Sequence, residues 1–116
     1  MGQTQTQGQK GETMAAEYLK KRGFKILERN VRTPFGEIDL ICQDQQALVF
    51  VEVKLRNSNV FGNPEDSIPG NKLERLKNSI NWYLDSHKTI KDYRLDVIAI
   101  ETDIQPPKIS HLENIS

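Results

Sequence analysis

GEIDLI at residues 36–41 and LVFVEVK at residues 48–54 are the two segments that decide the fold of this chain. The apolar residues in each are typical of β-strands, and the polar residues 43–46 between them predict an antiparallel hairpin. In an extended chain, Glu52 and Lys54 point to one face of the sheet. Because burying charge costs several kcal/mol unless the charges are paired or hold a metal, such a strand needs a chemical reason.

Asp39 supplies that reason, because it lies between Ile38 and Leu40 in the first of the two segments. The hairpin can bring Asp39, Glu52 and Lys54 together at one end. Two carboxylates offer the hard oxygen ligands that suit a hydrated divalent cation such as Mg²⁺, and an ammonium beside them suits a phosphodiester. The pattern therefore predicts a cation site that faces a phosphate group.

This order of an acid, a spacer and a Glu-x-Lys pair resembles the core of the PD-(D/E)XK nuclease superfamily, which includes restriction endonucleases and Holliday-junction resolvases. A longer string of matches is more specific. It comprises Gly11-Glu12, YLKKRGFKILERNVR at 18–32, GEIDLI, VFVEVKLR at 49–56, Phe61-Gly62 and RLDVIAI at 94–100. Over residues 8–100 the chain looks like the bacterial YraN-like family of predicted endonuclease-like proteins.

The resemblance implies an α/β fold with a restriction-endonuclease-like core and metal-dependent phosphodiester hydrolysis of nucleic acid. By resemblance, Asp39 and Glu52 would bind Mg²⁺ or Mn²⁺, with the backbone carbonyl of Val53 as a third ligand. Lys54 would orient the attacking water or stabilise developing negative charge. The expected substrate is DNA rather than RNA, including branched DNA, and a homodimer is suggested only by the superfamily.

Length and composition fit one compact domain. The 116 residues, 36% of them hydrophobic and 28% charged, can bury one core but not two. We expect a disordered lead-in over residues 1–9 and a single endonuclease-like domain over 10–116. The apolar runs are too short to cross a membrane, and the N-terminus lacks a hydrophobic signal core. With Cys42 as the single cysteine, these features predict a cytoplasmic protein without a membrane partner.

Charge is unevenly distributed along a chain whose formal net charge is zero. A neutral chain argues against a sequence-indifferent DNA coat protein. Seven basic and three acidic residues precede Gly36, whereas residues 36–53 contain four acids and no Lys or Arg. An acidic metal centre flanked by basic surface suits recognition of a phosphate backbone. For any single one of these charged residues, an ordinary position on a solvated face of a helix or strand is an equally good explanation.

The spacing of small and apolar residues predicts a first helix over residues 10–22, ended by Gly23. Glu12 shares one helix face with Ala15, Ala16 and Leu19, whereas Glu17 is turned away from it. Glu12 is therefore the helix acid that can reach the metal site, and it matches the acidic helix position of resolvase-like nucleases. The alternative is an acid that only favours the helix macrodipole.

The remaining elements complete a mixed sheet of four or five strands flanked by two helices. They are a strand at 24–31, a loop at 57–70, a helix at 71–87 with Asn71 as its N-cap, a strand at 94–100 and an edge strand at 108–115. The packing stripe of the second helix comprises Leu73, Leu76, Ile80, Tyr83, Leu84 and His87. With one helix expected on each side of the sheet, the class is α/β.

Four basic residues are candidates for contacts with phosphates that flank the scissile bond: Arg32, Arg56, Lys72 and Arg75. Solvated residues that cover the apolar stripe with their aliphatic stems are the alternative for Arg75. His87 and His111 lie far apart without ligand-like neighbours, so neither is assigned a catalytic role.

Two other functions remain open at this point. A non-catalytic nucleic-acid-binding or adaptor module would retain the nuclease fold without its activity. Alternatively, Asp39 and Glu52 would pair with Lys54 and Arg56 as a purely structural ion network. Binding of Mn²⁺ separates these cases, because an open site with two carboxylates binds the ion and a closed ion network does not.

Overall fold

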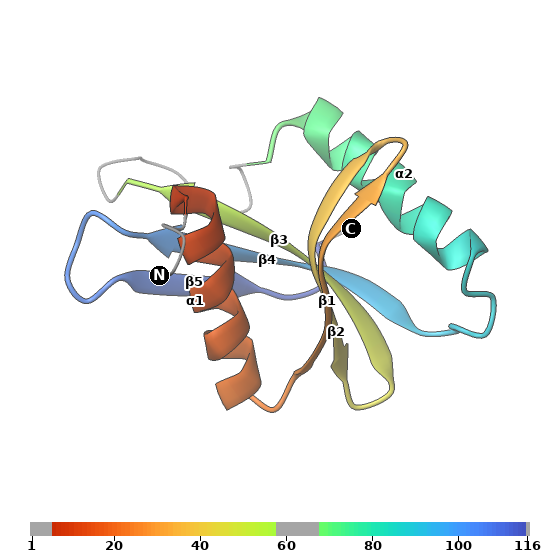
Figure 1. The fold of residues 1–116 in the computed structure, drawn as a ribbon, viewed down its shortest axis with the longest axis horizontal. Coiled ribbons are helices and arrows are strands. Elements are labelled where there is room, and N and C mark those ends of the chain that lie inside the picture. Colours follow the sequence, from red (N-terminus) through yellow and green to blue (C-terminus); the bar gives the residue numbers. More distant parts are fainter. Residues whose placement is uncertain (1–5, 58–67, 116) are drawn as a thin grey trace, which may run out of the picture.

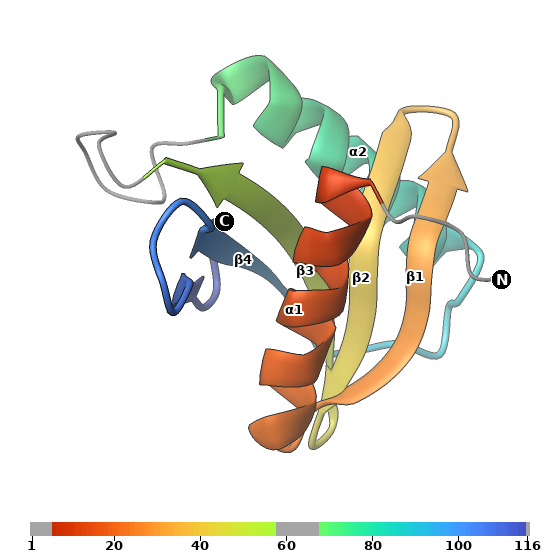
Figure 2. The ribbon, with the colours of Figure 1, turned by 60° about the vertical axis from the view of Figure 1, so that its left-hand side comes forward.

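A computed structural model describes residues 6–57 and 68–115 of the protein. In chain order, the elements are α1 (Gln7–Lys21), β1 (Lys25–Thr33), β2 (Gly36–Asp44), β3 (Ala47–Arg56), α2 (Gly70–Asp85), β4 (Tyr93–Glu101) and β5 (Lys108–Leu112). The strands form one sheet, and the two helices pack on opposite faces of it (Figures 1 and 2). This α/β architecture confirms the predicted fold class and is consistent with a restriction-endonuclease-like core.

The sheet is mixed, with the strand order β1-β2-β3-β4-β5. Strands β3 and β4 are parallel, and the other neighbours are antiparallel. A parallel pair needs a long crossover connection, and the chain between β3 and β4 contains α2. The charged strand β3 is thus central, and Glu52 lies opposite Val97 of β4.

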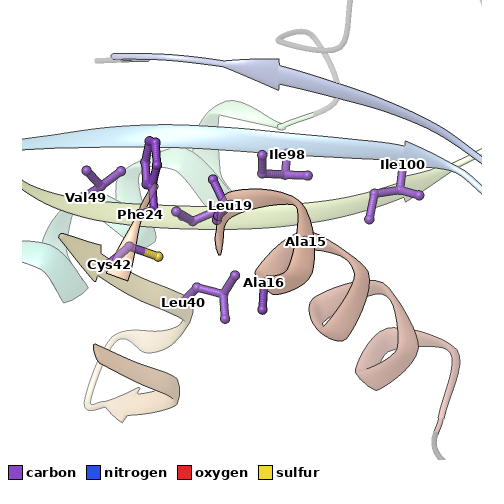
Figure 3. Packing of buried hydrophobic residues seen from close by; sticks show 10 residues of the cluster. Ala15, Ala16, Leu19, Phe24, Leu40, Cys42, Val49, Ile98 and Ile100 are labelled. Carbon is purple, nitrogen blue, oxygen red and sulfur yellow. The ribbon is translucent and has the colours of Figure 1, made fainter. Parts of the chain in front are cut away.

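Helix α1 covers one face of the sheet with small residues. Ala15, Ala16 and Leu19 pack against residues of β2, β3 and β4 (Figure 3). The close approach continues at Gly11, where an added Cβ would lie 2.6 Å from Leu55 Cδ2. The first turns of α1 are therefore held against the end of β3, and Glu12 is held there with them.

Helix α2 covers the other face with larger side chains. Leu76, Ile80 and Tyr83 pack against a second cluster that includes Phe50 of β3. Since strand residues alternate between faces, Glu52 continues the α2 face of β3 beyond Phe50. Neither helix, in the part of the chain that the structure describes, has the length and apolar character needed to span a membrane.

The first helix begins earlier than predicted. Thr6 caps it, because its hydroxyl accepts from the Gln9 amide and the Gln9 side chain accepts from the Thr6 amide. Residues 7–9, predicted as part of a disordered lead-in, are helical. Residues 1–5 of that predicted lead-in lie outside the described residues, as do residues 58–67, which include Phe61.

The second helix also differs at both ends from its predicted bounds. Pro69 is the N-cap rather than Asn71, because the first helical hydrogen bond runs from the Leu73 amide to the Pro69 carbonyl at 2.9 Å. The helix ends before Ser86, so His87 lies exposed beyond it. Its ring stacks on Tyr83, at 4.0 Å between centroids, and its Nδ1 lies 2.8 Å from the Tyr83 carbonyl oxygen.

A buried polar cluster fastens β5 to β4. Asp96 is fully buried and accepts from His111 Nε2 at 2.8 Å, from Arg94 Nε at 3.0 Å and from the Asn114 amide at 2.9 Å. Burial raises the pKa of Asp96, but these donors outweigh it, so the net pKa is lowered. The sequence placed no ligand-like residue near His111 along the chain, and its partner Asp96 comes from the neighbouring strand.

Asp96, His111 and Glu113 form a group whose ligand atoms lie close enough together to hold a metal ion, and Arg22 also contacts His111 there. Arg22 Nη1 lies 3.4 Å from His111 Nδ1, and an arginine can only donate, so Nδ1 accepts and Nε2 carries the proton given to Asp96. Both ring nitrogens of His111 thus have partners in this structure, and the cluster stabilises the edge of the sheet.

We expect Asp96→Asn to lower the free energy of unfolding by about 3 kcal/mol, because it leaves buried donors without a charged partner. Urea unfolding at pH 7 measures this loss. Asp44→Asn is the matched control, since it removes only a half-exposed contact to Arg94 and costs less than about 1 kcal/mol. Equal, small losses in the two variants would contradict the assigned role of Asp96.

Candidate functional site

A cleft of about 400 Å³ opens between the first turns of α1, the turn between β1 and β2, the end of β3 and the first turns of α2. The described residues that line it are Gly8, Glu12, Phe35, Gly36, Glu37, Asp39, Glu52, Val53, Leu55, Lys72, Arg75, Leu76 and Ser79. Four of these residues are acidic and two are basic. The lining thus carries an excess of negative charge.

The cleft forms where β2 leaves β3. Pairing between these strands ends at Leu40 and Val51. Beyond that pair, the Val53 amide donates to Asp39 Oδ2 at 2.8 Å instead of to a strand carbonyl. The Asp39 side chain thus satisfies a backbone group that the separation of the strands would leave without a partner.

The strand pair β1–β2 also bends at this level. Ile38 and Leu40 are two residues apart, yet they pack into cores on opposite faces of the sheet, so the usual alternation breaks at Asp39. On β1, the residue between their pairing partners is Asn30, which has a positive φ of 55°. This bend aims Asp39 into the opening between β2 and β3.

Asp39 and Glu52 share their environment, as the hairpin predicted. Burial raises the pKa of Asp39 to about 8, and the charge of Glu52 and a hydrogen bond between the two carboxyl groups act in the same direction. Near pH 7 the metal-free pair therefore retains a proton. A divalent cation would relieve this repulsion by taking the place of that proton.

Glu12 reaches the same site from α1, on the face that the helical periodicity selected. One carboxylate oxygen from each of Glu12, Glu37 and Asp39 lies within 4.8 Å of the others. Burial raises the pKa of Glu12, although a hydrogen bond from Asn30 and the charge of Arg29 oppose it. Three clustered carboxylates offer the hard oxygen donors that Mg²⁺ and Mn²⁺ prefer, so the cluster can hold a metal ion.

Glu37 was missed by the sequence reasoning. It lies two residues before Asp39 in the same strand, and strand alternation alone places such residues on one face. The two-residue spacing of Glu37 and Asp39 was the signal that could have identified Glu37.

The ammonium nearest the carboxylates belongs to Lys72. Its Nζ lies 2.8 Å from Glu52 Oε2, whose side chain is only 4% exposed. The hydrogen bond to Glu52 raises the pKa of Lys72, so this ion pair persists across the physiological range. Lys54 is half-buried on the same strand face as Glu52, but it does not line the cleft. Its catalytic role stays a prediction.

The other predicted site residues divide into two groups. Arg75 is exposed and lines the cleft, and so does Val53, whose carbonyl stays a predicted metal ligand. Arg32 is exposed on β1 and Arg56 is half-buried near the end of β3, and neither lines the cleft. Glu52 pairs with Lys72, and the alternative of a structural network with Lys54 and Arg56 stays a prediction.

Comparisons with known proteins agree over most of the chain. A family model described as "Uncharacterised protein family UPF0102" matches residues 11–100. A UPF0102 protein of Thermodesulfovibrio yellowstonii is 46% identical over 107 residues, which cover 92% of each chain. A UPF0102 protein of Syntrophomonas wolfei is 43% identical over 105 residues, which cover 90% of this chain and 91% of that protein. A UPF0102 protein of Shewanella oneidensis is 45% identical over 101 residues, covering 86% of this chain and 94% of that protein.

Removing a carboxylate charge while keeping its shape should weaken Mn²⁺ binding. We expect Asp39→Asn and Glu52→Gln each to raise the dissociation constant on the order of 100-fold or more, as calorimetric titration would measure. The matched control is Glu74→Gln on the exposed side of α2, which should bind Mn²⁺ as the wild type does. Unchanged affinity in both site variants would sink the metal-site interpretation.

The raised pKa of Asp39 predicts a pH-dependent cost to stability. Between pH 3.8, the ordinary pKa of an aspartate, and about pH 8, Asp39 is ionised in the unfolded chain but protonated in the folded protein. The stability of the metal-free protein therefore falls as pH rises through this range. Asp39→Asn abolishes this loss. In EDTA at pH 8 the variant should melt at least about 4 °C above the wild type, and by less at pH 5. Thermal unfolding at both pH values tests this, and coincident curves at pH 8 would refute it.

Proposed function

The chain belongs to the uncharacterised protein family UPF0102, the YraN family that its sequence resembles, and we propose that it is a metal-dependent nuclease. The observation that carries the proposal is the convergence of Glu12, Glu37 and Asp39 in one cleft, with Glu52 buried beside them. Such a costly concentration of negative charge is what a divalent-cation site requires.

The metal would be Mg²⁺ or Mn²⁺, held by Asp39 together with Glu12 and Glu37, with Glu52 and the Val53 carbonyl as further oxygen ligands. When bound, such an ion polarises a phosphoryl oxygen and makes its bound water more acidic. Asp39 prepares for it in two ways. Its carboxylate is oriented by the Val53 amide, and binding of a cation would displace the proton that the carboxyl retains.

The basic residues of the cleft would bind the phosphates. Arg75 is exposed on α2 and free to turn toward a phosphate next to the scissile one. Lys72 holds Glu52 in the metal-free protein. A metal ion that takes over the charge of Glu52 would release the Lys72 ammonium toward the substrate. Lys54 remains the proposed stabiliser of the charge that develops on the phosphorus oxygens.

Binding of nucleic acid should depend on the metal. Four acidic and two basic residues line the cleft, so without a cation it repels a phosphate group. The proposed substrate is DNA, including branched DNA, and the homodimer suggested by the superfamily belongs to this proposal. A reducing cytoplasm fits Cys42, which is free and fully buried.

A non-catalytic nucleic-acid-binding module is the second candidate. The observation that favours it is the position of Lys54, which does not line the cleft, together with the 2.8 Å pair that occupies Glu52. A protein of this kind would bind metal and nucleic acid through the same cleft without cutting.

Single-turnover cleavage separates these candidates. Linear, flapped, four-way-junction and RNA substrates would be incubated with Mg²⁺ or Mn²⁺ at low salt. We expect Lys54→Ala to slow cleavage on the order of 100-fold while changing binding little, as when one transition-state stabiliser is lost. Lys72→Ala combined with Arg75→Ala should weaken binding more than the cleavage step.

Lys88→Ala, at an exposed position away from the cleft, is the control for these variants. Binding without any cleavage above the Lys54→Ala level would replace the nuclease with the non-catalytic module. If Lys72→Ala slows single-turnover cleavage more than Lys54→Ala does, the catalytic role belongs to Lys72 rather than to Lys54.

A further inference from the structure

We propose that Phe35 stacks on an unpaired base of the substrate, so that the cleft selects nucleic acid with a single-stranded segment at the scissile phosphate. The inference rests on the proposed function, because it places the substrate phosphate at the carboxylates. It goes further by naming the substrate class and a specificity-determining residue.

Phe35 is the exposed aromatic residue of this cleft. It is 46% exposed and lines the cleft together with the charged residues and the aliphatic residues Val53, Leu55 and Leu76. An apolar ring that is exposed to water gains none of the free energy that burial of its surface provides, and a bound base would bury it. An aromatic ring offers a flat apolar face to a base, and stacking of this kind tolerates any base because each has a π-face.

The turn that carries Phe35 is fixed by a closed set of hydrogen bonds. The Thr33 hydroxyl donates to the Gly36 carbonyl at 2.9 Å and accepts from the Phe35 amide at 3.1 Å. The Ser79 hydroxyl, on a fully buried residue of α2, then donates to Thr33 Oγ1 at 2.7 Å between the two oxygens. Because these bonds tie the turn to the helix, little conformational freedom is left for a ligand to remove on binding.

Phe35 also lies at the right distance from the carboxylates. Glu37 is two residues further along the chain, so their Cα atoms are at most about 7 Å apart. One carboxylate oxygen of Glu37 belongs to the cluster with Glu12 and Asp39. A nucleotide with its phosphate at this cluster can therefore place its own base, or the next, against the Phe35 ring.

Duplex DNA does not fit this arrangement. Bases within a duplex are stacked on one another, so a ring can reach a base face there only at the cost of unstacking, whereas an unpaired base offers its face without that cost. The cleft volume of about 400 Å³ is within the range of pockets for small ligands, which is room for a nucleotide or two. With Lys72 and Arg75 as its basic residues, the lining makes few phosphate contacts, and stacking would supply the affinity that they do not.

Binding of two labelled probes tests the inference. A fluorescein-labelled 12-nucleotide single strand and a blunt hairpin duplex of the same sequence would be titrated with the full-length protein in Ca²⁺, which takes the same oxygen ligands. We expect Phe35→Ala to weaken single-strand binding roughly 5- to 100-fold and duplex binding less than about 2-fold. Phe35→Trp should bind the single strand at least as tightly as the wild type.

Tyr93→Ala is the matched control, because Tyr93 is 49% exposed but lies outside this cleft. It should leave binding of both probes unchanged. In a Trp82→Phe background, the emission of Phe35→Trp should be quenched by the single strand and much less by the duplex. This second readout reports contact at position 35 even where affinity changes little.

The outcomes distinguish this inference from the function on which it rests. If the wild type binds the single strand and Phe35→Ala binds it equally well, without quenching at Phe35→Trp, stacking is refuted and the nuclease proposal stands. Equal losses for both probes would refute the preference for unpaired bases. If the wild type binds neither probe with metal present, the proposed function fails and the inference fails with it.

Discussion

The separation of β2 from β3 beyond Leu40 and Val51 is the constraint on which the site depends. Two paired strands have no room between them for a ligand, and two separated strands leave backbone groups without partners. The hydrogen bond from the Val53 amide to the Asp39 carboxylate resolves this conflict, because it satisfies the backbone and holds the acid in the opening. The cleft, the clustering of Glu12 and Glu37, and the burial of Glu52 are all built around that opening.

Two buried aspartates show how the same side chain serves opposite purposes. Asp96 is surrounded by donors from His111, Arg94 and the Asn114 amide, so its pKa is lowered and its charge stabilises the sheet edge. Asp39 is surrounded by other carboxylates, so burial and repulsion raise its pKa to about 8. The first environment is complete within the chain. In the second, Asp39 retains a proton and belongs to a group of carboxylates that could hold a metal ion.

Much of the fold follows from local patterns. Alternation of apolar and polar residues predicts the strands, and the spacing of Ala15, Ala16 and Leu19 predicts the buried face of α1. The ends of the helices were predicted less well. The start of α1 depends on a reciprocal cap between Thr6 and Gln9, and the start of α2 depends on the Pro69 carbonyl. Hydrophobic periodicity gives no signal for either of these contacts.

The sequence by itself predicted that three of the four acids of the cleft can meet, because Glu12 lies on the packing face of a helix while Asp39 and Glu52 lie on adjacent strands. Only the tertiary structure decided which lysine side chain forms the ion pair with Glu52. Lys54 is two residues from Glu52 in the chain, yet Lys72 makes the 2.8 Å contact, because α2 packs across that face and projects its first turn over the end of β3. The bend at Asp39 likewise combines contacts from α1, β1 and β3 that strand alternation does not encode. Local periodicity specifies the face on which a side chain lies, whereas the packing of distant segments specifies its partner.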